Sequence, residues 1–253
     1  MPDPIAGRTA LVSGAGNGLG RAIALALSAR GARVILTGRR RNALSETASF
    51  IEDSRVATVD VADPASVGAL RDALHDEDVS ILVNNAGVAG PVKALTEIEP
   101  DEWDAVFAVN VRGTYLMCRA FLPPMLARGS GDVINVSSVT GKRPLPGRTP
   151  YAASKTAVHG LTVTLGAEVG GAGIRVNSLS PGPVEGPRME RNFRLEAQRS
   201  GITVEEAERA FVGRSALGRM VTEAEVGDAV VAMLSMTGLH CADIDLSAGM
   251  VAR

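Results

Sequence analysis

The residues whose types and spacing could do chemistry centre on Tyr151 and Lys155, in the stretch Tyr-Ala-Ala-Ser-Lys. Four residues is just over one helical turn, so in a helix the phenol and the ammonium project from the same face. The ammonium would lower the pKa of the phenol from its usual value of about 10, and such a phenol can exchange a proton with a substrate oxygen near neutral pH. Ser138 could hold that oxygen by a hydrogen bond. Because ordinary helices also contain this pair, its spacing alone does not establish a site.

A glycine-rich turn near the start of the chain has the context that a dinucleotide pyrophosphate needs. An apolar strand pattern over residues 9–12 leads into Gly14, Gly18 and Gly20, and an amphipathic helical pattern follows. Such a turn lets the backbone approach phosphates and presents the free N–H groups of a helix N-terminus. The spacing is Gly-x-x-x-Gly-x-Gly and not the commoner Gly-x-Gly-x-x-Gly, and a glycine-rich loop can also be a simple turn.

Three further segments place polar or turn-forming residues where ligands bind in open α/β sheets, at or near the carboxyl ends of strands. They are the turn Asn84-Asn85-Ala86-Gly87, Asn110 within an apolar helical pattern, and the turn Pro181-Gly182 after another strand pattern. The asparagine turn could equally cap its strand. The lone amide could equally be a core asparagine whose hydrogen bonds are satisfied internally.

Strand patterns alternate with helical patterns along the whole chain, which favours an α/β fold with a doubly wound parallel sheet. The strands are short and apolar, as is typical of a sheet that is buried on both faces. We expect them at residues 9–12, 33–37, 56–59, 81–83, 133–136, 175–179 and 244–246.

Together these features resemble the short-chain dehydrogenase/reductase family, in its branch of oxidoreductases of about this length, from Arg8 to Leu246. The resemblance implies one dinucleotide-binding domain over residues 1–253, a Rossmann-type sheet of about seven strands in the order 3-2-1-4-5-6-7, flanking helices and a helical substrate lid at about 184–220. It implies hydride transfer between a nicotinamide cofactor and a ketone or secondary alcohol, with no metal required.

The resemblance assigns roles to the matching positions. Tyr151 would be the general acid in reduction and the base in oxidation, Lys155 would lower its pKa and hold the nicotinamide ribose, and Ser138 would orient the carbonyl. Asn110 would fix a water that connects Lys155 to solvent. The expected cofactor contacts are Gly14, Asn17, Gly18, Leu19, Gly20, Arg39, Arg40, Asp60 and Val61 (at the adenine), Asn84, Asn85, Ala86, Gly87, Asn110, Tyr151, Lys155, Pro181, Gly182 and Val184.

The choice of cofactor is argued from the end of the second strand pattern, where Gly38 precedes three arginines. An NAD-preferring site usually places an acidic side chain there for the ribose 2′-hydroxyl, whereas a guanidinium can bind a 2′-phosphate with two hydrogen bonds. The sequence therefore predicts NADP(H), with Arg39 as the main contact and Arg40 as the second. NAD(H) stays open as the alternative, because the arginines could be a solvated helix start and because Asn17 stands where many NADP-using relatives carry a basic residue.

The segment from residue 184 to about 220 is helical and strongly charged in pattern, as in the family's usual substrate lid, and Thr203 resembles a helix N-cap within it. Arginines on a lid could clamp a carboxylate or sulfonate substrate, or they could be the solvated face of a lid helix. Arg188 is the first candidate because it follows the proline-glycine turn most closely, and Arg143 and Arg148 are further candidates. The expected substrate contacts are Ser138, Tyr151 and Arg188.

Bulk composition agrees with a small-molecule enzyme. A chain of 253 residues with 45% hydrophobic residues can bury a sizeable core, and a formal net charge of −2 gives no reason to expect nucleic acid or a membrane surface. The two cysteines and three histidines form no metal-like cluster, residues 1–5 lack the features of a signal peptide, and no apolar run approaches a membrane span. We therefore expect a cytoplasmic protein. The family resemblance implies that it self-associates as a homotetramer, with a dimer as the alternative.

The sequence favours an NADP(H)-dependent oxidoreductase acting on a ketone or secondary alcohol. One alternative is an NAD-dependent dehydrogenase of a secondary alcohol or small hydroxy acid. A second alternative is a non-catalytic scaffold that retains dinucleotide binding, against which the intact serine, tyrosine and lysine set argues.

Overall fold

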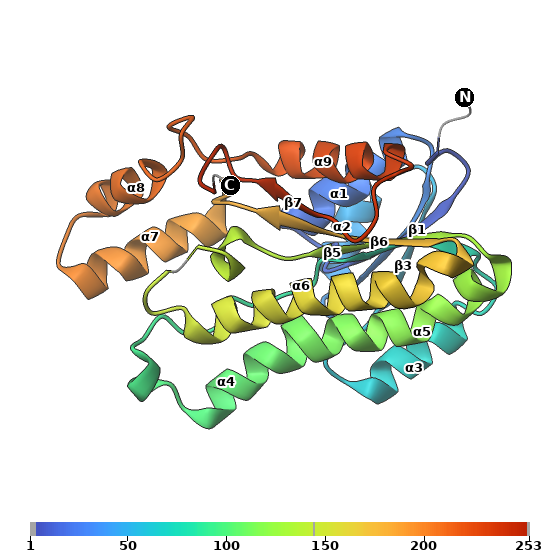
Figure 1. Cartoon of the computed structure of the whole chain (residues 1–253), viewed down its shortest axis with the longest axis horizontal. Helices are drawn as coiled ribbons and strands as arrows, with labels where there is room; N and C mark the ends of the chain where they lie inside the picture. Colours follow the sequence, from blue (N-terminus) through green and yellow to red (C-terminus); the bar gives the residue numbers. More distant parts are fainter. Residues whose placement is uncertain (1–3, 144, 252–253) are drawn as a thin grey trace.

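Seven parallel strands carry the fold, and helices cover both faces of their sheet (Figure 1). The structure is a computed structural model that describes residues 4–143 and 145–251. The strands lie in the order β3-β2-β1-β4-β5-β6-β7, so the expected doubly wound α/β sheet and its strand order are confirmed. They are β1 (Thr9–Ser13), β2 (Arg33–Gly38), β3 (Ser54–Thr58), β4 (Val79–Asn84), β5 (Gly131–Val136), β6 (Ile174–Pro181) and β7 (Asp243–Leu246).

The helices between these strands occupy two layers. In Figure 1, α1, α2 and α9 lie on one side of the sheet, whereas α3, α5 and α6 lie on the other. The helices are α1 (Gly18–Ala29), α2 (Arg41–Ala48), α3 (Pro64–Ala73), α4 (Pro100–Phe107), α5 (Gly113–Arg128), α6 (Thr149–Val169), α7 (Pro187–Ser200), α8 (Val204–Val212) and α9 (Glu223–Ser235).

Apolar side chains alternate between two cores, because successive residues of a strand point to opposite faces. In β1, Ala10 and Val12 pack in the core beneath α1 and α9, and Leu11 packs in the core beneath α3 and α5. Helices α1 and α9 approach each other closely at Gly227, where a Cβ atom would lie 2.8 Å from the carbonyl oxygen of Ala22. The sheet is therefore buried on both faces, as its apolar strands predict.

Two helices, α7 and α8, extend beyond the carboxyl ends of the strands and pack on each other (Figure 1). Phe193 and Phe211 meet edge to face with ring centroids 5.9 Å apart. Helix α7 ends at Gly201, which has a left-handed φ of 66°. Thr203 then caps α8, since its hydroxyl accepts from the N–H of Glu206 at 3.1 Å and the Glu206 carboxylate accepts from the N–H of Thr203 at 2.9 Å. This reciprocal cap satisfies two backbone N–H groups and so marks the start of α8.

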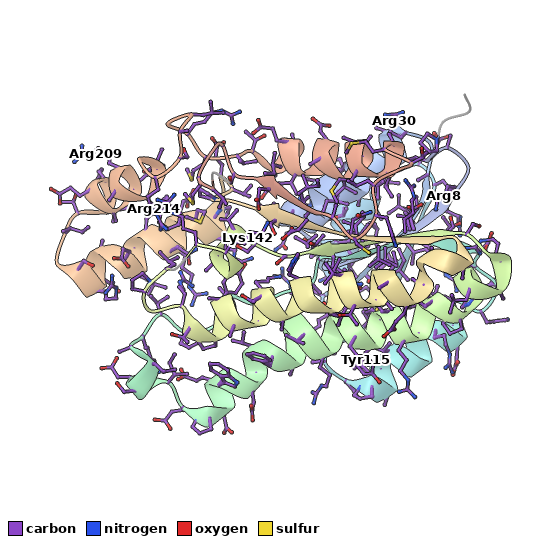
Figure 2. The ribbon with its side chains drawn as sticks, in the orientation of Figure 1. Arg8, Arg30, Tyr115, Lys142, Arg209 and Arg214 are labelled. Carbon is purple, nitrogen blue, oxygen red and sulfur yellow. The ribbon has the colours of Figure 1, made fainter. Side chains whose placement is uncertain are left out.

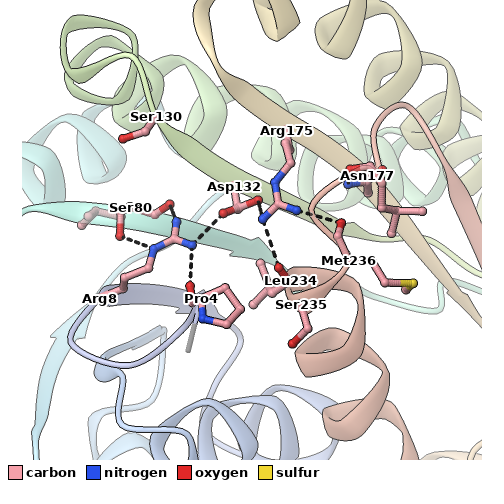
Figure 3. Close-up of polar contacts among 12 residues, drawn as sticks. Pro4, Arg8, Ser80, Ser130, Asp132, Arg175, Asn177, Leu234, Ser235 and Met236 are labelled. Carbon is pink, nitrogen blue, oxygen red and sulfur yellow. Dashed lines mark hydrogen bonds and ion pairs between the residues drawn. The ribbon is translucent and has the colours of Figure 1, made fainter. Parts of the chain in front are cut away.

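A buried carboxylate ties together the opposite, amino ends of the strands (Figure 3). Asp132 on β5 pairs with Arg8 at 2.8 Å and with Arg175 on β6 at 2.7 Å. Arg8 also donates to the hydroxyl of Ser80 on β4, and Arg175 donates to the carbonyl oxygen of Met236 at the end of α9. The network thus joins β1, β4, β5 and β6 at the edge that lies farthest from the carboxyl ends.

We expect Asp132→Asn to lower the free energy of unfolding by about 3 kcal/mol, because it leaves two largely buried guanidinium groups without their carboxylate. Urea unfolding at fixed protein concentration measures the effect. The matched control is Asp78→Asn, which breaks an ion pair with Arg128 in which the carboxylate is 75% exposed and should lose no more than about 1 kcal/mol. Equal losses in the two variants would contradict the structural importance of the buried carboxylate.

Candidate active site

The carboxyl ends of the central strands open into a cavity of about 760 Å³ whose lining includes the glycine-rich turn and residues of α7 and α8. Nearly all the residues that the sequence assigns to a site line this cavity, and the exceptions are Asn84 and Asn110. The residues lining it are Gly14, Asn17, Gly18, Leu19, Gly20, Arg39, Arg40, Asp60, Val61, Asn85, Ala86, Gly87, Ser138, Tyr151, Lys155, Pro181, Gly182, Val184 and Arg188.

The glycine-rich turn requires glycine at each of its three spaced positions. Gly14 and Gly18 have left-handed φ angles of 67° and 54°. Gly20 lies so close to the preceding turn that a Cβ atom would stand 2.2 Å from the carbonyl oxygen of Gly14. The first turn of α1 therefore faces the cavity without side chains from Gly18 or Gly20, and its backbone is accessible to a phosphate group.

Ser13, which the sequence analysis does not assign to the site, joins this turn to the asparagine turn after β4. Its hydroxyl accepts from the N–H groups of Asn85 and Ala86, each at 3.0 Å, and donates to the carbonyl oxygen of Val83. The Asn85 side chain in turn donates to the carbonyl oxygen of Ser13 at 2.9 Å. A serine at the last position of an apolar strand was the available signal, because a buried hydroxyl there must find partners in a neighbouring strand.

Asn84 does not reach the cavity, although the sequence places it with the cofactor contacts. Its side chain is buried and donates to Asn135 on β5 at 2.8 Å and to the sulfur of Cys118 at 3.3 Å. The carboxamide therefore links β4 to β5 and to α5 inside the protein.

Asn110 is also held behind the cavity wall. It lies in a π-helical segment, Ala108–Arg112, between α4 and α5. Its amide nitrogen donates to the carbonyl oxygen of Val88 and to the hydroxyl of Ser154, both at 3.0 Å, and its amide oxygen accepts from the N–H of Val88 at 2.8 Å. Asn110 thus fixes the backbone beside Gly87, and the water that the family resemblance places next to it stays a prediction.

Lys155 and Ser138 both lie near the Tyr151 phenol. Lys155 is 5% exposed as a residue. Its ammonium donates to the carbonyl oxygen of Val136 at the end of β5 at 2.7 Å and lies 5.8 Å from the centre of the Tyr151 ring. The Ser138 oxygen accepts from the N–H of Thr140 at 3.2 Å, which orients the hydroxyl as it caps a short helical turn. The expected constellation of serine, tyrosine and lysine is therefore assembled.

Arg188 adds a second cation beside the phenol. Its guanidinium carbon lies 5.4 Å from the centre of the Tyr151 ring. Burial alone would raise the pKa of Tyr151, but the charges of Arg188 and Lys155, together with hydrogen bonds from Ser138 and Arg188, lower that pKa from 10 to about 8. The sequence predicts the effect of Lys155, and the structure shows that the lid arginine contributes as well. Burial lowers the pKa of Lys155, and proximity to Arg188 lowers it further, whereas proximity to Tyr151 raises it.

The arginines after β2 also contribute to the cavity wall. Gly38 ends the strand, so no side chain occupies the position where a carboxylate would bind a ribose. Arg39 and Arg40 follow it, exposed to solvent and lining the cavity, and within the described part of the chain neither forms an ion pair. Both guanidinium groups are thus available to a ligand.

Of the further lid-side candidates, Arg148 is buried and lines the cavity, and Arg143 lines it while donating to the carbonyl oxygens of Arg214 and Met250. Across residues 4–143 and 145–251, no cluster of three histidine, cysteine or acidic side chains is suited to a metal ion. In the same two ranges, no helix combines the length and the apolar character that crossing a bilayer requires.

Comparison with known proteins gives concordant matches. The family model of the short chain dehydrogenases matches residues 8–198. A 2-(R)-hydroxypropyl-CoM dehydrogenase of Xanthobacter autotrophicus is 36% identical over 233 residues, which make up 88% of this chain and 90% of that protein. A solved xylitol dehydrogenase with bound NAD+ has a TM-score of 0.92 at 26% identity, with 97% of this chain and 99% of that chain covered. An actinorhodin polyketide ketoreductase variant with NADPH has a TM-score of 0.91 at 30% identity, with 99% of each chain covered.

The pKa of Tyr151 can be measured directly, because the chain has only two tyrosines and the other, Tyr115, is exposed on α5 (Figure 2). In a Tyr115→Phe background, tyrosinate absorbance should rise with a midpoint near pH 8. Arg188→Met should move this midpoint to higher pH, since it removes a positive charge that favours the phenolate. Arg194→Met, an exposed arginine on the same helix, should leave it in place. A midpoint that does not respond to Arg188→Met would contradict the electrostatic role of Arg188.

Proposed function

Because the chain belongs to the short-chain dehydrogenase/reductase family, we propose that it transfers a hydride between NADP(H) and a ketone or secondary alcohol. NAD(P)-dependent chemistry at a CH–OH group follows from membership, and the proposal adds the choice of cofactor and the residue that moves the proton. The observation that carries it is the Tyr151 phenol, whose pKa is lowered to about 8 at the wall of a cavity with a glycine-lined phosphate cradle.

The residues present fit a dinucleotide. Gly14 and Gly20 leave open backbone where a Cβ atom would clash, and the N-terminus of α1 presents a partial positive charge to the pyrophosphate. Arg39 and Arg40 would hold a 2′-phosphate. Asp60 and Val61 would flank the adenine. The turns at Asn85-Ala86-Gly87 and Pro181-Gly182, with Val184 and Lys155, would hold the nicotinamide end.

In reduction, Tyr151 and Ser138 hold the carbonyl oxygen, and Tyr151 gives its proton to that oxygen as negative charge develops there. Lys155 and Arg188 stabilise the phenolate that remains. In oxidation, the phenolate removes the hydroxyl proton by the reverse path. When bound, the nicotinamide supplies or accepts the hydride at the substrate carbon.

We infer further that the protein is cytoplasmic and self-associates, as a homotetramer or a dimer, through α5 and α6. Support for this interface comes from Tyr115 and Leu126, two large apolar side chains on α5 that are 48% and 40% exposed. No nucleic acid or membrane partner is proposed.

Replacing Tyr151 with phenylalanine should lower kcat about 10³-fold, because it removes the proton donor, while NADPH still binds. In the wild-type protein, kcat/KM for reduction should be constant below pH 8 and fall above it, since reduction needs the protonated phenol. The value for oxidation should rise to a plateau above pH 8, since oxidation needs the phenolate. Normal turnover by Tyr151→Phe would refute the mechanism.

Replacing Arg39 and Arg40 together with alanine should weaken NADPH binding about 10- to 100-fold, because charge-assisted hydrogen bonds to the phosphate are lost, and should leave NADH binding unchanged. Calorimetric titration with each cofactor measures both. Arg41→Ala is the matched control, since Arg41 is the next residue and does not line the cavity. Tighter binding of NADH than NADPH by the wild-type protein would favour the NAD-dependent alternative, and binding without turnover of any carbonyl compound would favour the scaffold.

A further inference from the structure

Two arginines from different elements line the lid end of the cavity. Arg148 immediately precedes α6, three residues before Tyr151, and Arg188 lies in the first turn of α7. Arg148 donates to the carboxamide of Asn192 at 2.6 Å, and Asn192 lies one helical turn after Arg188 on α7, so the two arginines are neighbours. Burial of Arg148, together with repulsion from Arg188, lowers the pKa of the Arg148 guanidinium. Chain segments that are 40 residues apart therefore bring two guanidinium groups to one wall beside the reacting phenol.

Arg148 is a buried cation without a carboxylate partner in the described residues. The residue is 6% exposed, and its guanidinium donates to the oxygen of the neutral Asn192 carboxamide at 2.6 Å. The nearby acid is Glu196, which also lines the cavity, but its carboxylate already accepts from Arg199 and Ser200. A guanidinium has five donors, and a buried cation without an opposing charge is costly, so this wall favours an anion.

The phosphates of the cofactor are proposed to lie against the N-terminus of α1 and against Arg39 and Arg40. The guanidinium of Arg188 instead lies beside the ring of Tyr151, the proposed proton donor. Phe193 and Phe211 from the packed lid helices add apolar surface to this wall, beside the polar Asn192 and Glu196. The positive charge therefore faces the space where a substrate would reach Tyr151.

We propose that Arg148 and Arg188 form an oxyanion subsite, so that the substrate is a ketone or secondary alcohol that also carries a carboxylate or sulfonate group. The inference rests on the proposed function and adds the class of substrate. Guanidinium groups bind such planar or tetrahedral oxyanions with paired, charge-assisted hydrogen bonds. Asn192 holds the Arg148 fork in place.

The subsite also couples binding to proton transfer. Arg188 favours the phenolate of Tyr151, and an anion bound to Arg188 offsets part of its positive charge. Binding of an acidic substrate therefore raises the pKa of Tyr151 and increases the protonated form that reduction uses. For an acidic ketone, the pKa seen in kcat should lie above the pKa seen in kcat/KM, whereas for its neutral analogue the two should agree.

The test compares matched pairs of substrates with NADPH: 2-, 3- and 4-oxocarboxylates and an oxoalkanesulfonate, each beside its neutral amide or sulfonamide. The wild-type protein should prefer the acid in at least one pair. Arg148→Met and Arg188→Met should each raise KM for that acid about 10- to 100-fold and so reduce the preference for acid over amide, with the NADPH dissociation constant within about twofold of the wild-type value. Arg194→Met, on the same helix but outside the cavity, should retain the preference.

Controls separate the subsite from folding and from the reaction itself. Arg148→Lys keeps the positive charge but lacks the forked guanidinium, and it should give an intermediate KM for the acid. If Arg148→Met does not fold, Arg188→Met alone tests the subsite, because Arg188 is exposed and its replacement should not disturb the core. Equal use of acids and amides by the wild-type protein, or a preference that survives both methionine variants, overturns the subsite. A parallel loss of NADPH affinity assigns the arginines to the cofactor and also overturns it.

If the wild-type protein turns over no pair, the proposed function loses support for acidic ketones, and binding alone tests the subsite. Calorimetric titration of the NADPH-loaded protein with the four acids then still decides the subsite. Acid binding that is lost in the methionine variants supports it, and no acid binding refutes it.

Discussion

The buried ammonium of Lys155 is the interaction on which the arrangement of the site depends. An ammonium removed from water costs several kcal/mol unless hydrogen bonds and nearby negative charge offset the loss of hydration. The carbonyl oxygen of Val136 supplies one such contact, and the Tyr151 phenol can supply negative charge when it ionises. The hydrogen bond from Lys155 to Val136 holds the end of β5 against α6. The turn after β4 packs against the same site, since a Cβ atom on Gly87 would lie 3.6 Å from the ammonium and 3.2 Å from the amide oxygen of Asn110.

Charge is divided unequally between the two ends of the sheet. At the amino ends, Asp132 lies between Arg8 and Arg175, so positive and negative groups are matched inside the protein. At the carboxyl ends, Lys155, Arg148 and Arg188 line one cavity, and none of the three forms an ion pair with a carboxylate of the described residues. The first arrangement stabilises the fold. The second leaves positive charge unpaired, which favours binding of an anionic ligand.

Much of the fold could be predicted from the sequence, because short apolar runs with turn residues between them specify a sheet buried on both faces. The predicted and observed strand boundaries agree to within two residues. Strand β6 continues to Pro181 because Ser180 and Pro181 pair with β7, and this pairing cannot be read from the polar residues at the end of the strand. The glycine turn was predictable for the same local reason. Asn84 was not, because neighbouring asparagines look equivalent in a sequence. Successive side chains point to opposite sides of an extended chain, so Asn85 reaches the glycine turn whereas Asn84 points into the core.

In the lid, the sequence alone does not show which charged side chains face the cavity. Its many charges do not themselves show which of them face inward. The apolar residues of α7, namely Met189, Phe193 and Ala197, recur every four residues and mark the packed stripe. The stripe beside it contains residues 188, 192 and 196, which line the cavity. The same four-residue spacing could have selected Arg188 from the other lid arginines, but Arg148 could not have been found in this way, since only the fold brings it near α7.

The π-helical segment Ala108–Arg112 has a consequence for how the gene can change. A π-turn is an α-helix that has accepted one additional residue, and here helical backbone continues without a loop from α4 to α5. Deleting that residue would rotate one side of the helix by about 100° relative to the other. Either Asn110 would turn away from Val88 and Ser154, or Gly113 would leave its close contact with Val61. Insertions and deletions are ordinarily tolerated in loops and not in packed helices. In this chain, a deletion within the π-helical segment would be among the most disruptive, because it breaks contacts on one side of the helix.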